Sequence, residues 1–228
     1  MNLTVAFAGI AAGALVWWLA VRRLTTRPWE AQGTSDGRDS AGTTGPAPAR
    51  IGLWIFLAVI TSLFALFITG YWMRMGHGMA HGIVHDWHPV AEPRVLWLNT
   101  ALLVLGSISM QWARGAANRG AADRARLAWL LGGVFAVAFL LGQLFAWRQL
   151  QAAGYYAAAN PANASFYLLT GVHAVHLIGG LFVWGRTALR MLRGAELEDL
   201  RLSVELCTVY WHYLLLVWLI LFGLLLLT

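Results

Sequence analysis

Four ionisable side chains lie inside or at the edge of strongly apolar stretches in the last third of the sequence. They are His173, His176, Glu205 and His212. An ionisable group in an apolar environment is costly, so it is usually found paired, hydrogen-bonded, bound to a metal ion or engaged in proton transfer. These four residues are therefore the first candidates for a functional site.

Their spacing predicts two polar stripes that can face each other. His173 and His176 are three residues apart and share one helix face, while Glu205 and His212 share another face with Thr208 between them. At a rise of 1.5 Å per residue, His176 is expected roughly 12 Å and His212 roughly 8 Å from the same end of their apolar stretches. The two stripes can therefore meet.

Such a meeting point suits a proton relay, a metal site or hydrogen bonds that join two helices in lipid. A closed metal site usually needs three or four convergent ligands, and nothing in the sequence shows that these side chains converge. We therefore favour interhelical hydrogen bonding for the four residues.

A second group of histidines lies in a glycine-rich segment, RMGHGMAHGIVHDWHPVAEPR, at 74–94. Its members are His77, His81, His85 and His88. Spacings of four, four and three would align them on one side of a helix, which suits copper or zinc. However, Gly76, Gly78 and Gly82 oppose a stable helix. We favour a structural or adventitious role, with a metal site as the alternative.

The rest of the sequence lacks the patterns of common catalytic and cofactor sites. It has no glycine-rich phosphate loop, no Ser-His-Asp arrangement, no cysteine pair for zinc and no c-type haem attachment sequence. The single Cys207 cannot form an intrachain disulfide. We therefore expect no catalysis by this chain alone and no redox cofactor bound to it.

The elements that would position these residues are membrane-spanning helices. Of the 228 residues, 59% are hydrophobic and 11% are charged, and a helix needs roughly 20 apolar residues to cross the hydrocarbon core. Six such stretches occur, at Leu3–Val21, Ile51–Met73, Val95–Trp112, Leu127–Trp147, Phe166–Trp184 and Cys207–Leu227. The sequence predicts an all-α polytopic transmembrane bundle, with an N-terminal transmembrane helix at 1–22, a flexible cytoplasmic linker at 23–50 and a five-helix domain at 51–228.

The basic residues predict the orientation of this bundle. All sixteen are Arg, and only Arg74, Arg94 and Arg148 lie on the opposite side of the spans from the other thirteen. By the positive-inside rule, the Arg-rich side is cytoplasmic and both termini are outside. Topology thus accounts for the net charge of +6, and no nucleic-acid partner is expected.

Tryptophans support the predicted ends of the spans. Eight of them lie at these ends, where their amphipathic rings are expected at the level of the lipid headgroups: Trp17, Trp18, Trp72, Trp97, Trp112, Trp129, Trp147 and Trp184.

Five sequence motifs occur in order between residues 51 and 228. The segments are GLWIFLAVITSLFALFITGY at 52–71, LWLNTALLVLGSIS at 96–109, the Gly-Gln pair at 142–143, FYLLTGVHAVHLIGGLFVW at 166–184 and VELCTVYWHYLLLVW at 204–218. Together they resemble the spans of haem-copper terminal oxidase subunit III, the cytochrome c oxidase subunit 3 family. The matching positions are Trp54, Asn99, Thr100, Gln143, Thr170, Gly171 and Gly180, and the polar cluster His173, His176, Glu205, Tyr210, Trp211 and His212.

The resemblance implies a non-catalytic subunit of a proton-pumping oxidase that reduces oxygen to water in a bacterial inner membrane. It implies subunits I and II as partners, haem and copper held by those partners, stabilisation of subunit I, and phospholipid bound between helices. Typical members carry a Ser-Glu pair where this chain has Val59 and Ile60, and an Asp where it has Leu215. Roles of those acids in lipid binding and proton uptake are therefore not expected here.

Other functions stay open at this stage. The missing acids and the single helix before the core also suit a subunit III-like protein of a nitric oxide reductase. The histidine-rich segment suits a membrane protein that delivers copper to an oxidase. A secondary transporter is disfavoured, because the spans lack paired Pro or Gly interruptions in corresponding halves.

Overall fold

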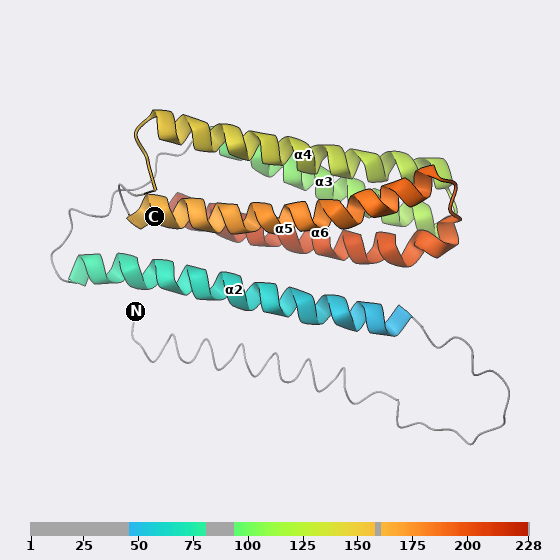
Figure 1. Ribbon diagram of the computed structural model, residues 1–228, viewed down its shortest axis with the longest axis horizontal. Coiled ribbons are helices and arrows are strands. Elements are labelled where there is room, and N and C mark those ends of the chain that lie inside the picture. Colours follow the sequence, from blue (N-terminus) through green and yellow to red (C-terminus); the bar gives the residue numbers. More distant parts are fainter. Residues whose placement is uncertain (1–45, 81–93, 158–160, 228) are drawn as a thin grey trace, which may run out of the picture. The chain divides into compact units, whose positions relative to one another are not determined.

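The structure, a computed structural model, describes residues 46–80, 94–157 and 161–227, and these residues form five helices and no strand. The helices are α2 (Pro46–Ala80), α3 (Val95–Asn118), α4 (Ala122–Ala152), α5 (Pro161–Leu192) and α6 (Leu197–Leu227) (Figure 1). The prediction of an all-α fold is confirmed. The N-terminal helix and most of the linker predicted from the sequence lie outside the described residues.

All five helices are long and apolar enough to cross a membrane. The shortest of these spans has 24 residues, which at 1.5 Å per residue covers about 36 Å, more than the roughly 30 Å of the hydrocarbon core. The chain is therefore an integral membrane protein. Four of the helices, α2, α4, α5 and α6, begin earlier than the apolar stretches that predict them. The difference is largest for α6, which starts at Leu197 and not near Cys207. Glu198 and Asp199 lie in its first turn, where carboxylates favour the helix N-terminus.

Short connections at one end of the bundle join α3 to α4 and α5 to α6 (Figure 1). Gly120 and Gly194 follow the ends of α3 and α5 with φ of 72° and 83°, a left-handed conformation that suits glycine after a helix. These tight turns make consecutive helices antiparallel neighbours. Eight arginines lie near this end: Arg114, Arg119, Arg124, Arg126, Arg186, Arg190, Arg193 and Arg201.

Small residues line the contact between α3 and α4, which is the most extensive helix pair of the bundle. Gly106 and Ala113 of α3 and Gly132 and Ala136 of α4 are all buried. A methyl group added at Gly132 would lie 3.1 Å from Met110, so only small side chains allow this approach. Contacts of α3 with α6, α6 with α5 and α5 with α4 then close a four-helix arrangement.

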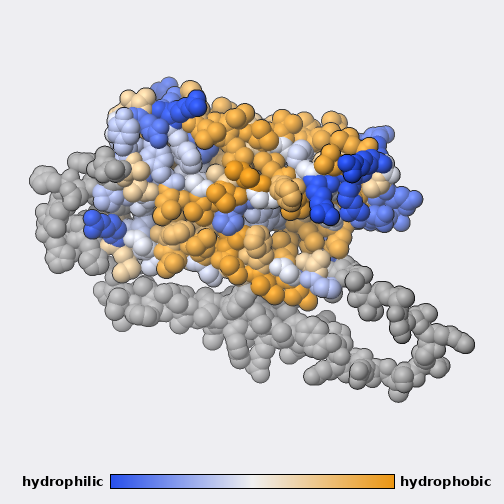
Figure 2. Space-filling view, in the orientation of Figure 1, coloured by the Kyte–Doolittle hydropathy of each residue, from blue (hydrophilic) through white to orange (hydrophobic). Residues whose placement is uncertain are grey.

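The chain divides into two compact units, Met1–Ile55 and Phe56–Thr228. The described residues of the first unit form the initial turns of α2, where Trp54 is 53% exposed. On the face of the second unit shown in Figure 2, apolar residues cover the middle of the helices and hydrophilic residues gather near their ends. This distribution suits a bilayer in contact with the middle of the bundle.

Candidate functional site

His173 lies in the centre of the second unit, enclosed by aromatic rings. Its side chain is fully buried, with ring centroids 5.4 Å from Trp218 of α6 and 5.8 Å from Phe139 of α4. Phe64 of α2 approaches its edge at 6.5 Å. Neither ring nitrogen has a hydrogen-bond partner among the described residues. The described residues thus provide no interhelical hydrogen bond for His173, because aromatic rings and not polar groups surround it.

His176 joins α5 to α6 through its backbone. The hydroxyl of Tyr210 donates to the His176 carbonyl oxygen at 2.9 Å. The ring Nδ1 lies 2.8 Å from the Val172 carbonyl oxygen of the same helix, and because that oxygen only accepts, Nδ1 carries the proton. Gly180 makes room for this junction, since a Cβ atom there would lie 2.8 Å from the Tyr210 ring.

Glu205 faces α3 and not the histidines of α5. Its Oε1 lies 3.4 Å from a guanidinium nitrogen of Arg114, and both side chains are about one-third exposed. Next to this ion pair, the buried Thr208 hydroxyl lies 3.2 Å from the Met110 carbonyl oxygen of α3 and 2.7 Å from its own Val204 carbonyl oxygen. This polar face of α6 therefore meets α3.

His212 is exposed on the outside of the bundle. Its Nδ1 lies 2.8 Å from the Thr208 carbonyl oxygen of its own helix. The two predicted stripes do not meet, and no group of three His, Cys, Asp or Glu residues that could hold a metal ion occurs in the part of the chain that the structure describes. The rotation of α6 explains the difference, because it turns Tyr210 towards α5 and His212 away from it.

Three other motif positions form polar contacts inside the bundle. The Asn99 amide donates to the Gln143 carbonyl oxygen at 3.2 Å between α3 and α4, and Gly142 leaves the room that the Asn99 side chain fills. Thr100 accepts the indole N–H of Trp218 at 2.9 Å between α3 and α6. All these groups sit at helix contacts, so they specify how the helices pair.

Trp211 lies at the contact of α6 with α5, and Thr170 and Gly171 lie at the contact of α5 with α4. Trp211 is 2% exposed, and its indole nitrogen has no hydrogen-bond partner among the described residues. Thr170 accepts the indole N–H of Trp147 at 3.2 Å, and a Cβ atom on Gly171 would lie 3.8 Å from the same indole ring. The half-buried Trp147 thus packs against α5.

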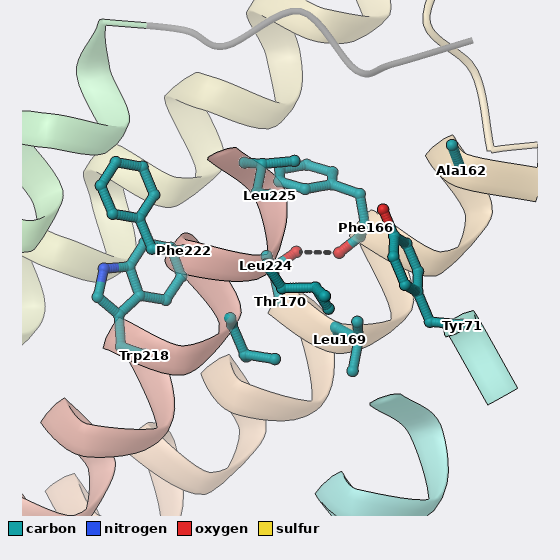
Figure 3. A pocket seen from close by; sticks show the side chains of 10 residues that line it. Tyr71, Ala162, Phe166, Leu169, Thr170, Trp218, Phe222, Leu224 and Leu225 are labelled. Carbon is teal, nitrogen blue, oxygen red and sulfur yellow. Dashed lines mark hydrogen bonds between the residues drawn. The ribbon is translucent and has the colours of Figure 1, made fainter. Parts of the chain in front are cut away.

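An apolar cavity of about 30 Å³ opens between α2, α5 and α6 (Figure 3). Phe166, Leu169 and Thr170 of α5 line one side, and Trp218 and Leu221 of α6 line another. The Thr170 hydroxyl is already engaged within its own helix, because it donates to the Phe166 carbonyl oxygen at 2.7 Å. The lining therefore suits a hydrocarbon ligand better than a polar one.

Most of the histidine-rich segment lies outside the described residues. This holds for His81, His85 and His88, and therefore also for the metal site that their spacing suggests. His77 belongs to the last turn of α2.

Comparison with known proteins gives the family. The family model of cytochrome c oxidase subunit III matches residues 7–227. The chain belongs to this family. The match covers nearly the whole sequence, including the segment that precedes the five motifs.

Curated relatives of the family are similar over most of this chain. The cytochrome c oxidase subunit 3 of Corynebacterium diphtheriae is 25% identical over 80% of this chain and 89% of its own length. The cytochrome bo(3) ubiquinol oxidase subunit 3 of Pseudomonas aeruginosa is 27% identical over 81% of this chain and 84% of its own length. The heme-copper oxidase subunit I+III of Aeropyrum pernix is 27% identical over 77% of this chain, which covers only 22% of that longer protein.

Two structural features of this subunit III were missed from the sequence. Arg114 was interpreted only as a topological charge, yet it pairs with Glu205.

The second feature is a pair of tryptophans. Trp129 was expected at the headgroup level, yet its side chain is fully buried. Its indole N–H donates to the Trp184 carbonyl oxygen at 3.3 Å, and the indole N–H of Trp184 donates to the Trp129 carbonyl oxygen at 2.9 Å. Gly133 leaves the space that the Trp184 ring occupies. A glycine four residues after a tryptophan was the available sequence clue.

Proposed function

We propose that this chain is the non-catalytic third subunit of a proton-pumping haem-copper terminal oxidase in a bacterial inner membrane. The match to the subunit III family over residues 7–227 carries the proposal. In the complex, the partner subunits would hold haem and copper and reduce oxygen to water. This chain would bind subunit I, lie near subunit II and stabilise subunit I during turnover.

The similarity to a fused relative supports subunit I as the main neighbour. The protein of Aeropyrum pernix is named heme-copper oxidase subunit I+III, and this chain is similar to part of it. Two proteins joined in one polypeptide usually act in the same assembly. The five helices, each long and apolar enough to cross the membrane, would lie beside those of such a neighbour in the bilayer plane.

Phospholipid binding is a second part of the proposal. The cavity between α2, α5 and α6 has apolar walls formed by residues such as Leu169, Leu221 and Leu225. An acyl chain entering from the bilayer would bury its methylene groups against these side chains. Each buried methylene contributes about 0.8 kcal/mol, so even partial insertion would retain lipid through purification.

Purification of the intact complex tests the proposed function. The chain is tagged at its C-terminus, extracted with mild detergent and analysed by absorption spectrum, oxygen consumption and identification of the bands that co-elute. A haem spectrum, a large multi-span partner and oxygen consumption are expected. A colourless chain that elutes alone would contradict the proposal, and a partner that reduces nitric oxide but not oxygen would replace it with a nitric oxide reductase.

A further inference from the structure

The outward faces of α4 and α5 are uniformly apolar within the membrane span. Between Leu127 and Phe145, every exposed residue of α4 is Leu, Val or Phe. Between Ala164 and Val183, every exposed residue of α5 is apolar or Gly. These two faces are suited to contact with lipid tails, because they expose no polar side chain to the hydrocarbon.

The outward face of α6 differs, because His212 is exposed halfway along it. His212 lies fifteen residues from Leu197 and fifteen from Leu227, the two ends of α6. Its Nδ1 carries the ring proton, because it donates a hydrogen bond to the Thr208 carbonyl oxygen, which can only accept. With the proton on Nδ1, Nε2 is free to accept a hydrogen bond, and no such bond forms in the part of the chain that the structure describes.

Polar side chains extend from His212 towards both neighbouring helices. On the α3 side, Gln111 is exposed three residues before Arg114, which pairs with Glu205. On the α2 side, the Tyr213 hydroxyl lies 2.9 Å from the exposed Thr61 hydroxyl. We call this surface the polar patch, formed by Thr61, Gln111, Arg114, Glu205, His212 and Tyr213.

A lipid tail cannot satisfy the polar patch. Hydrocarbon offers no donor to His212 Nε2 and no partner to the Gln111 amide. Polar side chains at membrane depth normally face a protein neighbour or a water-filled cavity. The contrast with α4 and α5 therefore marks the α3–α6–α2 side as a surface for a protein.

We propose that the polar patch binds a transmembrane helix of the large haem-bearing subunit, and that this helix donates a hydrogen bond to Nε2 of His212. The inference rests on the proposed function and specifies which side of the chain meets the partner. Serine, threonine, tyrosine, tryptophan and asparagine side chains can supply the donor. The apolar stretch Leu3–Val21 of this chain is a poorer occupant, because its only donor side chains, Thr4, Trp17 and Trp18, lie towards its two ends, whereas His212 lies halfway along α6.

Photo-crosslinking in the purified complex tests the proposal without changing the patch. A photoreactive amino acid replaces Leu216, which is 55% exposed one turn after His212, or Leu141, which is 62% exposed on α4. Position 216 is expected to cross-link to the haem-bearing subunit, and position 141 to lipid. Cross-links from position 216 to lipid only, to a second copy of this chain or to its residues 1–22 would overturn the proposal.

A pair of substitutions tests the hydrogen bond itself. His212→Leu should lower the haem retained per tagged chain after a detergent wash by on the order of threefold to tenfold, as expected for one hydrogen bond in lipid. His212→Gln keeps an acceptor and should retain most of the haem, and Val137→Leu on α4 should retain all of it. Wild-type retention by His212→Leu would overturn the role of His212. A wild-type chain that captures no haem subunit would contradict the proposed function instead.

Discussion

At the scale of single residues, His173 behaves as a packing residue. Three aromatic rings surround it, and its ring nitrogens have no partner among the described residues. A buried polar group without a hydrogen bond costs about 1–3 kcal/mol, and a leucine in its place removes that cost while still filling most of the space. We expect His173→Leu to leave the free energy of unfolding in detergent within about 1 kcal/mol of wild type, whereas Phe139→Ala should lower it by about 3–5 kcal/mol. Unfolding with increasing SDS measures both, and equal decreases would contradict the packing role.

The ion pair between Arg114 and Glu205 allows a second prediction at this scale. Because both side chains are about one-third exposed, Arg114→Gln and Glu205→Gln should each lower the free energy of unfolding by on the order of 1 kcal/mol. The double variant should be destabilised by less than the sum, since each single change already weakens the same interaction. A double-mutant cycle in detergent measures this coupling, and additive effects would show that the pair contributes nothing.

At the scale of helices, the sequence predicts the five described elements but not their rotation. Apolar length identified each span. It did not identify the first ten residues of α6, LEDLRLSVEL, because these turns are amphipathic and charged. Spacing also placed Glu205 and His212 on one face of α6. Which neighbour that face meets depends on the packing of α6 against α5, where Gly180 lies next to Tyr210 and Trp211. Such a close approach forms only in three dimensions. The predicted meeting with His176 therefore failed, while the motif residues Asn99 and Gln143 proved to be partners.

Two adjacent glycines of α5 give a matched test of helix packing. A Cβ atom at Gly180 would lie 2.8 Å from the Tyr210 ring and 3.2 Å from the Trp211 ring, whereas nothing lies within 4 Å of one at Gly179. Gly180→Ala should therefore lower the free energy of unfolding by about 1–3 kcal/mol. Gly179→Ala should be neutral or raise it by up to about 1 kcal/mol, because alanine favours the helix. SDS titration of both variants checks the contrast, and similar effects would contradict the close approach of α5 and α6.

At the scale of the whole molecule, the arginines predict the orientation in the membrane. Eight arginines lie near the end of the bundle that contains the α3–α4 and α5–α6 connections, and Arg74, Arg94 and Arg148 lie near the other end. Retention of arginine on the cytoplasmic side orients the helices during insertion. Alkaline phosphatase, which is active only outside the inner membrane, should be inactive when fused after Arg119 and active when fused after Tyr156 or Thr228. The reverse pattern would place the Arg-rich end outside and would put the Arg114–Glu205 pair nearer the outer surface of the membrane than the cytoplasmic one.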